Sequence, residues 1–182
     1  MKKILILAAV SVFGFISVAQ AQTANATLNV VLEPLLSIAV QNGNGGSATD
    51  VKLVYDSRQK YNDGVTENIV DHLKVSSAHA YQVKVKALGD LQNVSSSDVI
   101  ALGATEGISL KATAGTGTTR LTSAGNVSLS TSEQTLISGP AVFDGLINVA
   151  YRGKGRNAYL TKFKQDGGTT YTTTLTYTIT VN

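Results

Sequence analysis

The chain has 182 residues, with no cysteine, no tryptophan and only two prolines, and its formal net charge is +3. A chain without cysteine forms no disulfides, so an exported domain of this kind must be held together by packing or by partners. The small net charge gives no reason to expect nucleic acid as a partner.

Residues 1–21 have the three parts of a secretory signal peptide: a head with two lysines, an apolar run and the small-residue sequence Ala-Gln-Ala. The apolar run is too short to favour a transmembrane helix. We therefore expect export, with cleavage before Gln22. Loss of the two lysines leaves 13 of the 15 basic residues against 12 acidic ones, a net charge of about +1.

The first mature segment, residues 26–34, alternates in the manner of a strand with one buried face. Its apolar face consists of Ala26, Leu28, Val30 and Leu32. Pro34 lacks a backbone donor and marks the end of this strand. The segment is either the first strand of a self-contained sandwich or a strand that pairs with another copy of the chain. The alternation is the same in both cases and leaves the choice open.

Residues 35–182 are predicted to form one β-rich domain. The expected strands are residues 35–40, 51–55, 69–76, 81–87, 108–112, one or two short strands within 126–137, then 146–151 and 171–181. A turn-forming cluster at 41–46 and a polar loop at 56–67 separate the first of them. The last strand is the most regular, because every even position from Thr170 to Thr180 is threonine. Roughly seven to nine strands between turn signals predict an immunoglobulin-like β-sandwich.

The residues that could carry catalysis or bind a metal all fit simpler interpretations. His72 and His79 have no further ligand at metal-binding spacing. Asp56, Asp63 and Asp71 do not match the spacing of a calcium loop. The sequence has neither a phosphate loop nor a Gly-x-Ser-x-Gly motif. We therefore predict no catalytic residue, no cofactor and no metal.

One basic stretch is a candidate site for an acidic surface ligand, such as a sialylated glycan or a membrane headgroup. It contains Arg152, Lys154, Arg156, Lys162 and Lys164, with Tyr151 and Tyr159 interleaved. The alternative is that these cations belong to a solvated loop and strand face.

The order of elements resembles the beginning of major pilins of the colonisation-factor class of chaperone-usher fimbriae. It runs from a signal peptide through an alternating strand, Glu33-Pro34, a buried strand and an Asn/Gly-rich turn to Val51-Lys52-Leu53-Val54-Tyr55. The likeness is best over residues 26–56 and looser over 73–87. The terminal strand is similar to the last strand of many fimbrial subunits, including archaic and spore-coat-U-like groups. The absence of cysteine agrees with the colonisation-factor class and departs from spore-coat-U-like subunits.

The resemblance implies an incomplete immunoglobulin-like sandwich, residues 35–182, preceded by a donor-strand extension, residues 22–34. A periplasmic chaperone would fill the gap in the sandwich until the extension of another copy replaces it at an outer-membrane usher. The donor side chains would be Ala26, Leu28, Val30 and Leu32, and the acceptor groove would be lined by Leu35, Ile38, Val40, Leu175, Tyr177, Ile179 and Val181.

The expected function is that of a structural subunit of a bacterial surface fimbria that supports adhesion. The alternative is a self-contained secreted or surface-attached β-sandwich whose basic stretch binds a glycan.

Overall fold

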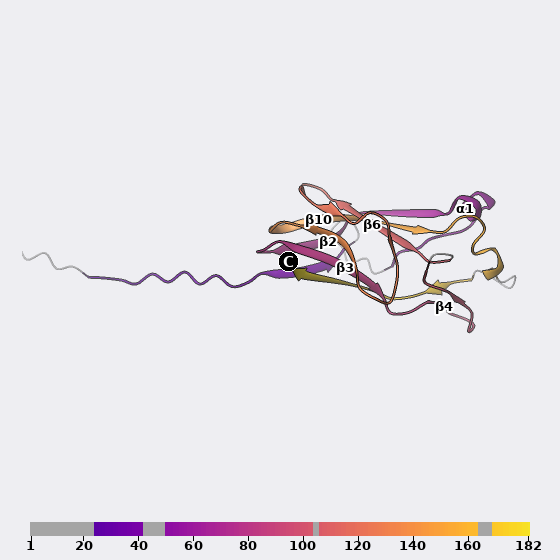
Figure 1. Cartoon of the computed structure of the whole chain (residues 1–182), viewed down its shortest axis with the longest axis horizontal. Helices are drawn as coiled ribbons and strands as arrows, with labels where there is room; N and C mark the ends of the chain where they lie inside the picture. The colour runs from indigo at the N-terminus through magenta and orange to yellow at the C-terminus, as the bar shows by residue number, and fades with distance from the viewer. Residues whose placement is uncertain (1–23, 42–49, 104–105, 164–168) are drawn as a thin grey trace, which may run out of the picture. The chain divides into compact units, whose positions relative to one another are not determined.

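The computed structural model describes residues 24–41, 50–103, 106–163 and 169–182. The chain divides into two units, residues 1–32 and 33–182. In the first unit, residues 24–32 have no regular secondary structure. The second unit contains all the described strands (Figure 1). The predicted signal peptide, residues 1–21, and the predicted turn from residue 42 onward lie outside the described residues.

The second unit is an all-β sandwich of antiparallel sheets, as the sequence predicts. The larger sheet has the strand order β1 (Leu36–Val40), β2 (Val65–Ser77), β10 (Val142–Gly153), β6 (Ser109–Ala114) and β8 (Val127–Ser128). The second sheet has the order β12 (Leu175–Val181), β3 (Tyr81–Ala87), β9 (Gln134–Gly139) and β7 (Thr122–Ser123). A small sheet contains β11 (Tyr171–Thr172), β4 (Leu91–Asn93) and β5 (Val99–Ile100).

The core is formed by the inward-facing side chains of the two larger sheets. On β3, the side chains at every second position from Tyr81 to Ala87 are buried, and those between them are partly exposed. This is the alternation that the sequence predicts for a strand with one buried face. The side chains that meet them from the larger sheet include Leu73, Val75, Leu110, Ile147 and Val149.

Residues 51–67 differ from the prediction in two ways. The expected strand at 51–55 has the predicted facing, because Val51, Leu53 and Tyr55 pack against the core, but it joins no sheet among the described strands. The expected loop at 56–67 contains a short helix, α1 (Arg58–Asp63), and its last residues, 65–67, already belong to β2. Ser57 caps this helix by accepting a hydrogen bond from the Lys60 amide, which is the usual role of serine at this position.

The predicted terminal strand is two strands in different sheets. β11 pairs with β4 and β12 pairs with β3, so the chain changes sheets at Thr173 and Thr174. The Thr173 hydroxyl donates to the Gly89 carbonyl at 2.8 Å, and the Thr174 carbonyl accepts from the Leu88 amide at 2.9 Å. These two bonds fix the crossing, which an unbroken threonine alternation does not reveal.

A 3-10 helix, η1 (Leu160–Lys162), follows β10. No helix among the described residues is long and apolar enough to cross a membrane.

Candidate functional site

β1 and β12 are edge strands of different sheets, and they lie beside each other. Among the described strands, β1 pairs only with β2 and β12 pairs only with β3. β1 and β12 are in contact, but no backbone ladder joins them. The sandwich therefore has two neighbouring strand edges, and an unpaired edge is a template for another strand.

The two edge strands run in opposite directions. Leu36 is the register partner of Ser77, at the end of β2, and Val181 is the partner of Tyr81, at the start of β3. β1 therefore begins at the end of the sandwich where β12 finishes. Figure 1 shows the C-terminus at the end of the sandwich opposite to α1. A strand that added antiparallel to β12 would run parallel to β1.

The space between the two edges is narrow. Some residues of β1 and β12 have their Cα atoms within 8 Å of each other. Two strands that flank a third in a sheet are about 9.6 Å apart, which is twice the usual spacing. Insertion of a strand along this line therefore requires β1 and β12 to move apart.

The side chains predicted to line an acceptor groove are on or next to these two edge strands. Ile38, Val40, Leu175, Tyr177 and Ile179 are partly buried and pack against the core. Leu35 and Val181 remain 40% and 48% exposed, at the end where β1 begins and β12 finishes. The fold therefore brings the predicted residues to one side of the sandwich, where their apolar surface is incompletely covered.

The predicted donor segment presents its apolar side chains to solvent. Leu28 and Leu32 are each 87% exposed and Val30 is 75% exposed, while Ala26 is also exposed. These side chains alternate along residues 26–32 but are not in a strand. Their burial would therefore require a partner surface.

A largely buried hydrogen-bond network connects the two sheets beneath the edge strands. The Nδ1 atom of His72 on β2 lies 2.8 Å from the carbonyl oxygen of Gln41, directly after β1. Its Nε2 atom lies 2.7 Å from the Tyr151 hydroxyl on β10, which in turn lies 2.5 Å from the Tyr177 hydroxyl on β12. A carbonyl only accepts, so Nδ1 carries the proton of the neutral ring and Nε2 accepts from Tyr151.

Burial shifts the pKa of all three titratable side chains in this hydrogen-bond network. Desolvation lowers the pKa of His72 below its ordinary value of 6.5, because the charged ring loses its hydration. It raises the pKa of Tyr151 to about 12, and it also raises the pKa of Tyr177, with the neighbouring Tyr151 as a further cause. All three groups are therefore neutral near pH 7. The sequence gives no local signal for this hydrogen-bond network, because its side chains are on three separate strands.

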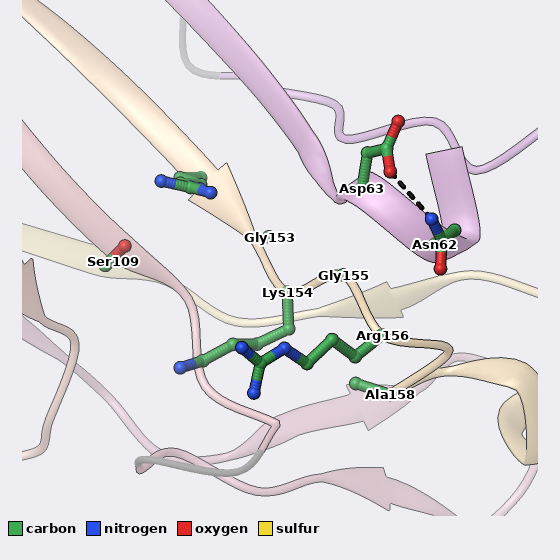
Figure 2. Close-up of a pocket in the computed structure, with 9 residues that line it drawn as sticks. Asn62, Asp63, Ser109, Gly153, Lys154, Gly155, Arg156 and Ala158 are labelled. Carbon is green, nitrogen blue, oxygen red and sulfur yellow. Dashed lines mark hydrogen bonds between the residues drawn. The ribbon is translucent and has the colours of Figure 1, made fainter. Parts of the chain in front are cut away.

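The basic stretch is divided between two places. Arg152, Lys154 and Arg156 line a hollow of about 610 Å³ together with Asn62, Asp63, Ser109, Gly153, Gly155 and Ala158 (Figure 2). Lys162 is instead paired with Asp98 at 3.2 Å and lies 3.9 Å from Glu106. Its hydrogen bond to Asp98 is the main cause that raises the pKa of Lys162. Lys164 lies outside the described residues.

The loop that carries Lys154 and Arg156 is fixed to α1 and to three tyrosines. The amide of Arg156 donates to the Asn62 carbonyl at 2.5 Å, and the amide of Asn157 donates to the Tyr61 carbonyl at 2.8 Å. The Lys154 carbonyl accepts from the Tyr55 hydroxyl at 2.8 Å. The ring of Tyr55 in turn contacts those of Tyr61 and Tyr159, with centroids 5.4 and 5.1 Å away.

Two glycines permit this close packing. A Cβ added to Gly153 would collide with the Tyr55 hydroxyl, and one added to Gly155 would collide with the Asn62 carbonyl oxygen. The backbone below the hollow is therefore rigid, while the cationic side chains project from it. The sequence indicates the cations but not the α1 residues that complete the hollow.

The other residues considered for catalysis or metal binding take part in hydrogen bonds within the fold. His72 belongs to the hydrogen-bond network described above, and His79 donates its backbone amide to the Ser77 hydroxyl at the end of β2. The carboxylate of Asp71 accepts from the Thr116 amide at 2.7 Å. Within the described part of the chain, no group of three His, Cys, Asp or Glu side chains is placed to hold a metal ion.

Comparison with known proteins identifies no family. No protein-family model matches the chain, and no curated protein matches it. The resemblance to fimbrial subunits therefore rests on the strand patterns of the sequence.

Proposed function

We propose that this protein is a structural subunit of a bacterial surface filament that assembles by strand exchange between copies of the chain. The observation that carries the proposal is the pair of neighbouring edges, β1 and β12, which have no ladder between them. The same chain has an alternating apolar segment with exposed side chains, residues 26–32. Each copy thus has an apolar segment without a core of its own and a pair of incompletely covered strand edges.

Strand addition of this kind produces a filament. The donor segment and the acceptor edges are different surfaces, so each copy can donate to one neighbour and accept from another. Such a head-to-tail contact does not close on itself unless the rotation between copies happens to form a ring. The filament grows outward from the cell, and the finished polymer supports adhesion.

The apolar contribution is large enough for stable assembly. Burial of the three large donor side chains, Leu28, Val30 and Leu32, contributes on the order of 5 to 9 kcal/mol before the entropy cost of ordering the segment. Backbone hydrogen bonds to the two edges add to this. A small domain has a net stability of only about 5–15 kcal/mol, so the added strand changes its stability substantially.

The proposal includes two assembly partners. Exposed strand edges and apolar side chains promote aggregation before assembly, so a periplasmic chaperone covers the edges of the unassembled subunit. β1 and β12 must also move apart to admit a strand, and the chaperone holds them in the open arrangement. An outer-membrane usher then exchanges the chaperone for the donor segment of the next copy.

A peptide experiment tests the strand-addition step. A synthetic peptide of residues 25–34 is added to the purified chain, and the melting temperature is followed by circular dichroism. We expect the melting temperature to rise with peptide concentration, because a ligand that binds the folded state stabilises it. The matched control is the same peptide with Val30→Asp, which should have no effect. Equal results with both peptides would contradict the proposal.

A further inference from the structure

The hollow around Lys154 and Arg156 has a chemistry that filament assembly does not use. Figure 2 shows the side chains of Lys154 and Arg156 extending in the same direction, with Asn62 and Asp63 on α1 apart from them. Arg152 also lines the hollow, so three cations lie within five residues of sequence. None of them forms an ion pair with a carboxylate among the described residues, whereas Lys60, Lys74 and Lys162 each do.

The backbone that carries Lys154 and Arg156 is held by hydrogen bonds rather than by ion pairs. Arg156 and Asn157 have φ of 56° and 58°, a conformation that costs free energy for residues other than glycine. The hydrogen bonds of their amides to the α1 carbonyls maintain this conformation. The loop therefore presents its cationic side chains from a rigid base, which lowers the entropy cost of binding a ligand.

The polar groups of the hollow are of two kinds. Lys154 and Arg156 provide only donors, and they suit an anionic oxygen. Asp63 provides acceptors, and its Oδ1 atom already accepts a hydrogen bond from the Asn62 side-chain amide at 2.8 Å. Ser109 provides a hydroxyl that can donate or accept. A ligand that matches all of them has one acidic group and several hydroxyl groups.

This combination disfavours a ligand with dense negative charge. A phosphate group or a polyphosphorylated headgroup would place two or more negative charges near the Asp63 carboxylate. A sugar with a single carboxylate would direct its charge to the cations and its hydroxyls to Asp63. The volume of about 610 Å³ is also in the usual range for a small-molecule site.

We propose that the hollow lined by Arg152, Lys154, Arg156, Ser109 and Asp63 binds an acidic sugar. The carboxylate of the sugar lies between Lys154 and Arg156, and its hydroxyl groups bond to Asp63 and Ser109. The site lies in the sandwich unit and uses none of the donor or edge residues. Binding is therefore independent of the proposed assembly.

Ligand-observed NMR of the full chain tests the site, whether the protein is present as subunits or as filaments. Two acidic probes are each compared with a neutral counterpart: glucuronate with glucose, and N-acetylneuraminate with N-acetylmannosamine. We expect at least one acidic probe to bind at millimolar concentration and its counterpart to bind at least about tenfold more weakly. Binding of the acidic probe should weaken as the salt concentration is raised. The ion pair between its carboxylate and the cations is partly exposed, and salt screens exposed charges. No binding of either acidic probe at about 50 mM would overturn the proposal.

Variants locate the binding on the protein. Lys154→Gln combined with Arg156→Gln should reduce the affinity for the acidic probe at least about tenfold, while Lys86→Gln in the other sheet, the matched control, should not. Circular dichroism verifies that each variant is folded. Unchanged binding by the double variant would overturn the assignment.

Inorganic phosphate distinguishes the ligand class. Asp63→Asn should weaken binding of the acidic sugar and strengthen any binding of phosphate, because it removes an acceptor and a negative charge together. Phosphate that binds the unmodified protein more tightly than both acidic sugars, and that is lost in the Lys154/Arg156 double variant, would overturn the sugar assignment in favour of a phosphate ligand.

Discussion

The imidazole Nε2 atom of His72 lies 2.7 Å from the hydroxyl oxygen of Tyr151, and both side chains are buried. The rings meet edge to face, with centroids 5.6 Å apart. This contact is the middle of the hydrogen-bond network that runs from the Gln41 carbonyl to the Tyr177 hydroxyl and connects the end of β1 with β12. β1 and β12 have no ladder between them, but this hydrogen-bond network links them from beneath.

His72 should make the stability of the fold depend on pH. Burial lowers the pKa of His72, so the unfolded chain binds more protons than the folded one as pH falls through about 6.5. We expect the free energy of unfolding to decrease below this pH and the decrease to stop below the folded-state pKa. Urea denaturation at a series of pH values between about 5 and 8 measures this dependence.

Replacement of His72 isolates its contribution. His72→Gln should flatten the profile between about pH 5 and 7. The carboxylates of Asp56 and Asp98 have a pKa lowered mainly by hydrogen bonds from Lys60 and Tyr171, so they contribute at lower pH. A slope that persists in His72→Gln would show that another group is responsible.

Tyr151 and Tyr177, the two tyrosines of the hydrogen-bond network, should contribute differently to the free energy of unfolding. Tyr151→Phe removes the donor to His72 and leaves a buried nitrogen unpaired, at a cost of about 1–3 kcal/mol in the free energy of unfolding. Tyr177→Phe leaves the bond between Tyr151 and His72 intact, so its cost should be nearer about 1 kcal/mol. Urea denaturation at pH 7.5 compares them, and an equal or reversed order would contradict the direction assigned to the hydrogen bonds.

Val30→Asp should prevent assembly without preventing folding. Val30 is 75% exposed, so the aspartate costs the single chain little. In an assembled filament, the same carboxylate would be buried without a partner, at a cost of at least several kcal/mol. Sedimentation and electron microscopy of the purified chain measure assembly, and circular dichroism measures folding.

Two further variants serve as controls for this result. Val54→Asp, at another exposed valine, should both fold and assemble, while Val83→Asp, at a fully buried position of β3, should fail to fold. If Val30→Asp misfolds as Val83→Asp does, residues 26–34 serve their own domain and the filament proposal fails.

Gly155→Ala should destabilise the loop that carries the basic hollow. The added Cβ would collide with the Asn62 carbonyl oxygen, which is backbone and cannot turn aside. We expect a loss of about 1–3 kcal/mol, as for other overpacked sites. Gly89→Ala is the matched control, because no atom lies within 4 Å of its added Cβ. Thermal unfolding compares the two, and equal stability would show that the loop can move away from α1.

Predictions from the sequence were most accurate where one strand has one buried face. Residues 81–87 match β3 throughout, because each side chain reports by itself which face it occupies. The same rule correctly predicted the facing of Val51, Leu53 and Tyr55 but not their lack of a ladder. Facing depends on the residue itself, whereas pairing depends on whether another strand is within reach.

The sequence by itself determined the strand-rich composition, the all-β class and the residues that alternate toward a core. Only the tertiary structure decided that β11 and β12 belong to different sheets, that His72 meets Tyr151, and that Lys162 pairs with Asp98 and does not line the hollow with Arg156. The reason is physical: alternation is a property of neighbouring residues along one strand. Contacts between strands depend on the register and crossing of segments far apart in the chain, and no short stretch of sequence contains both partners.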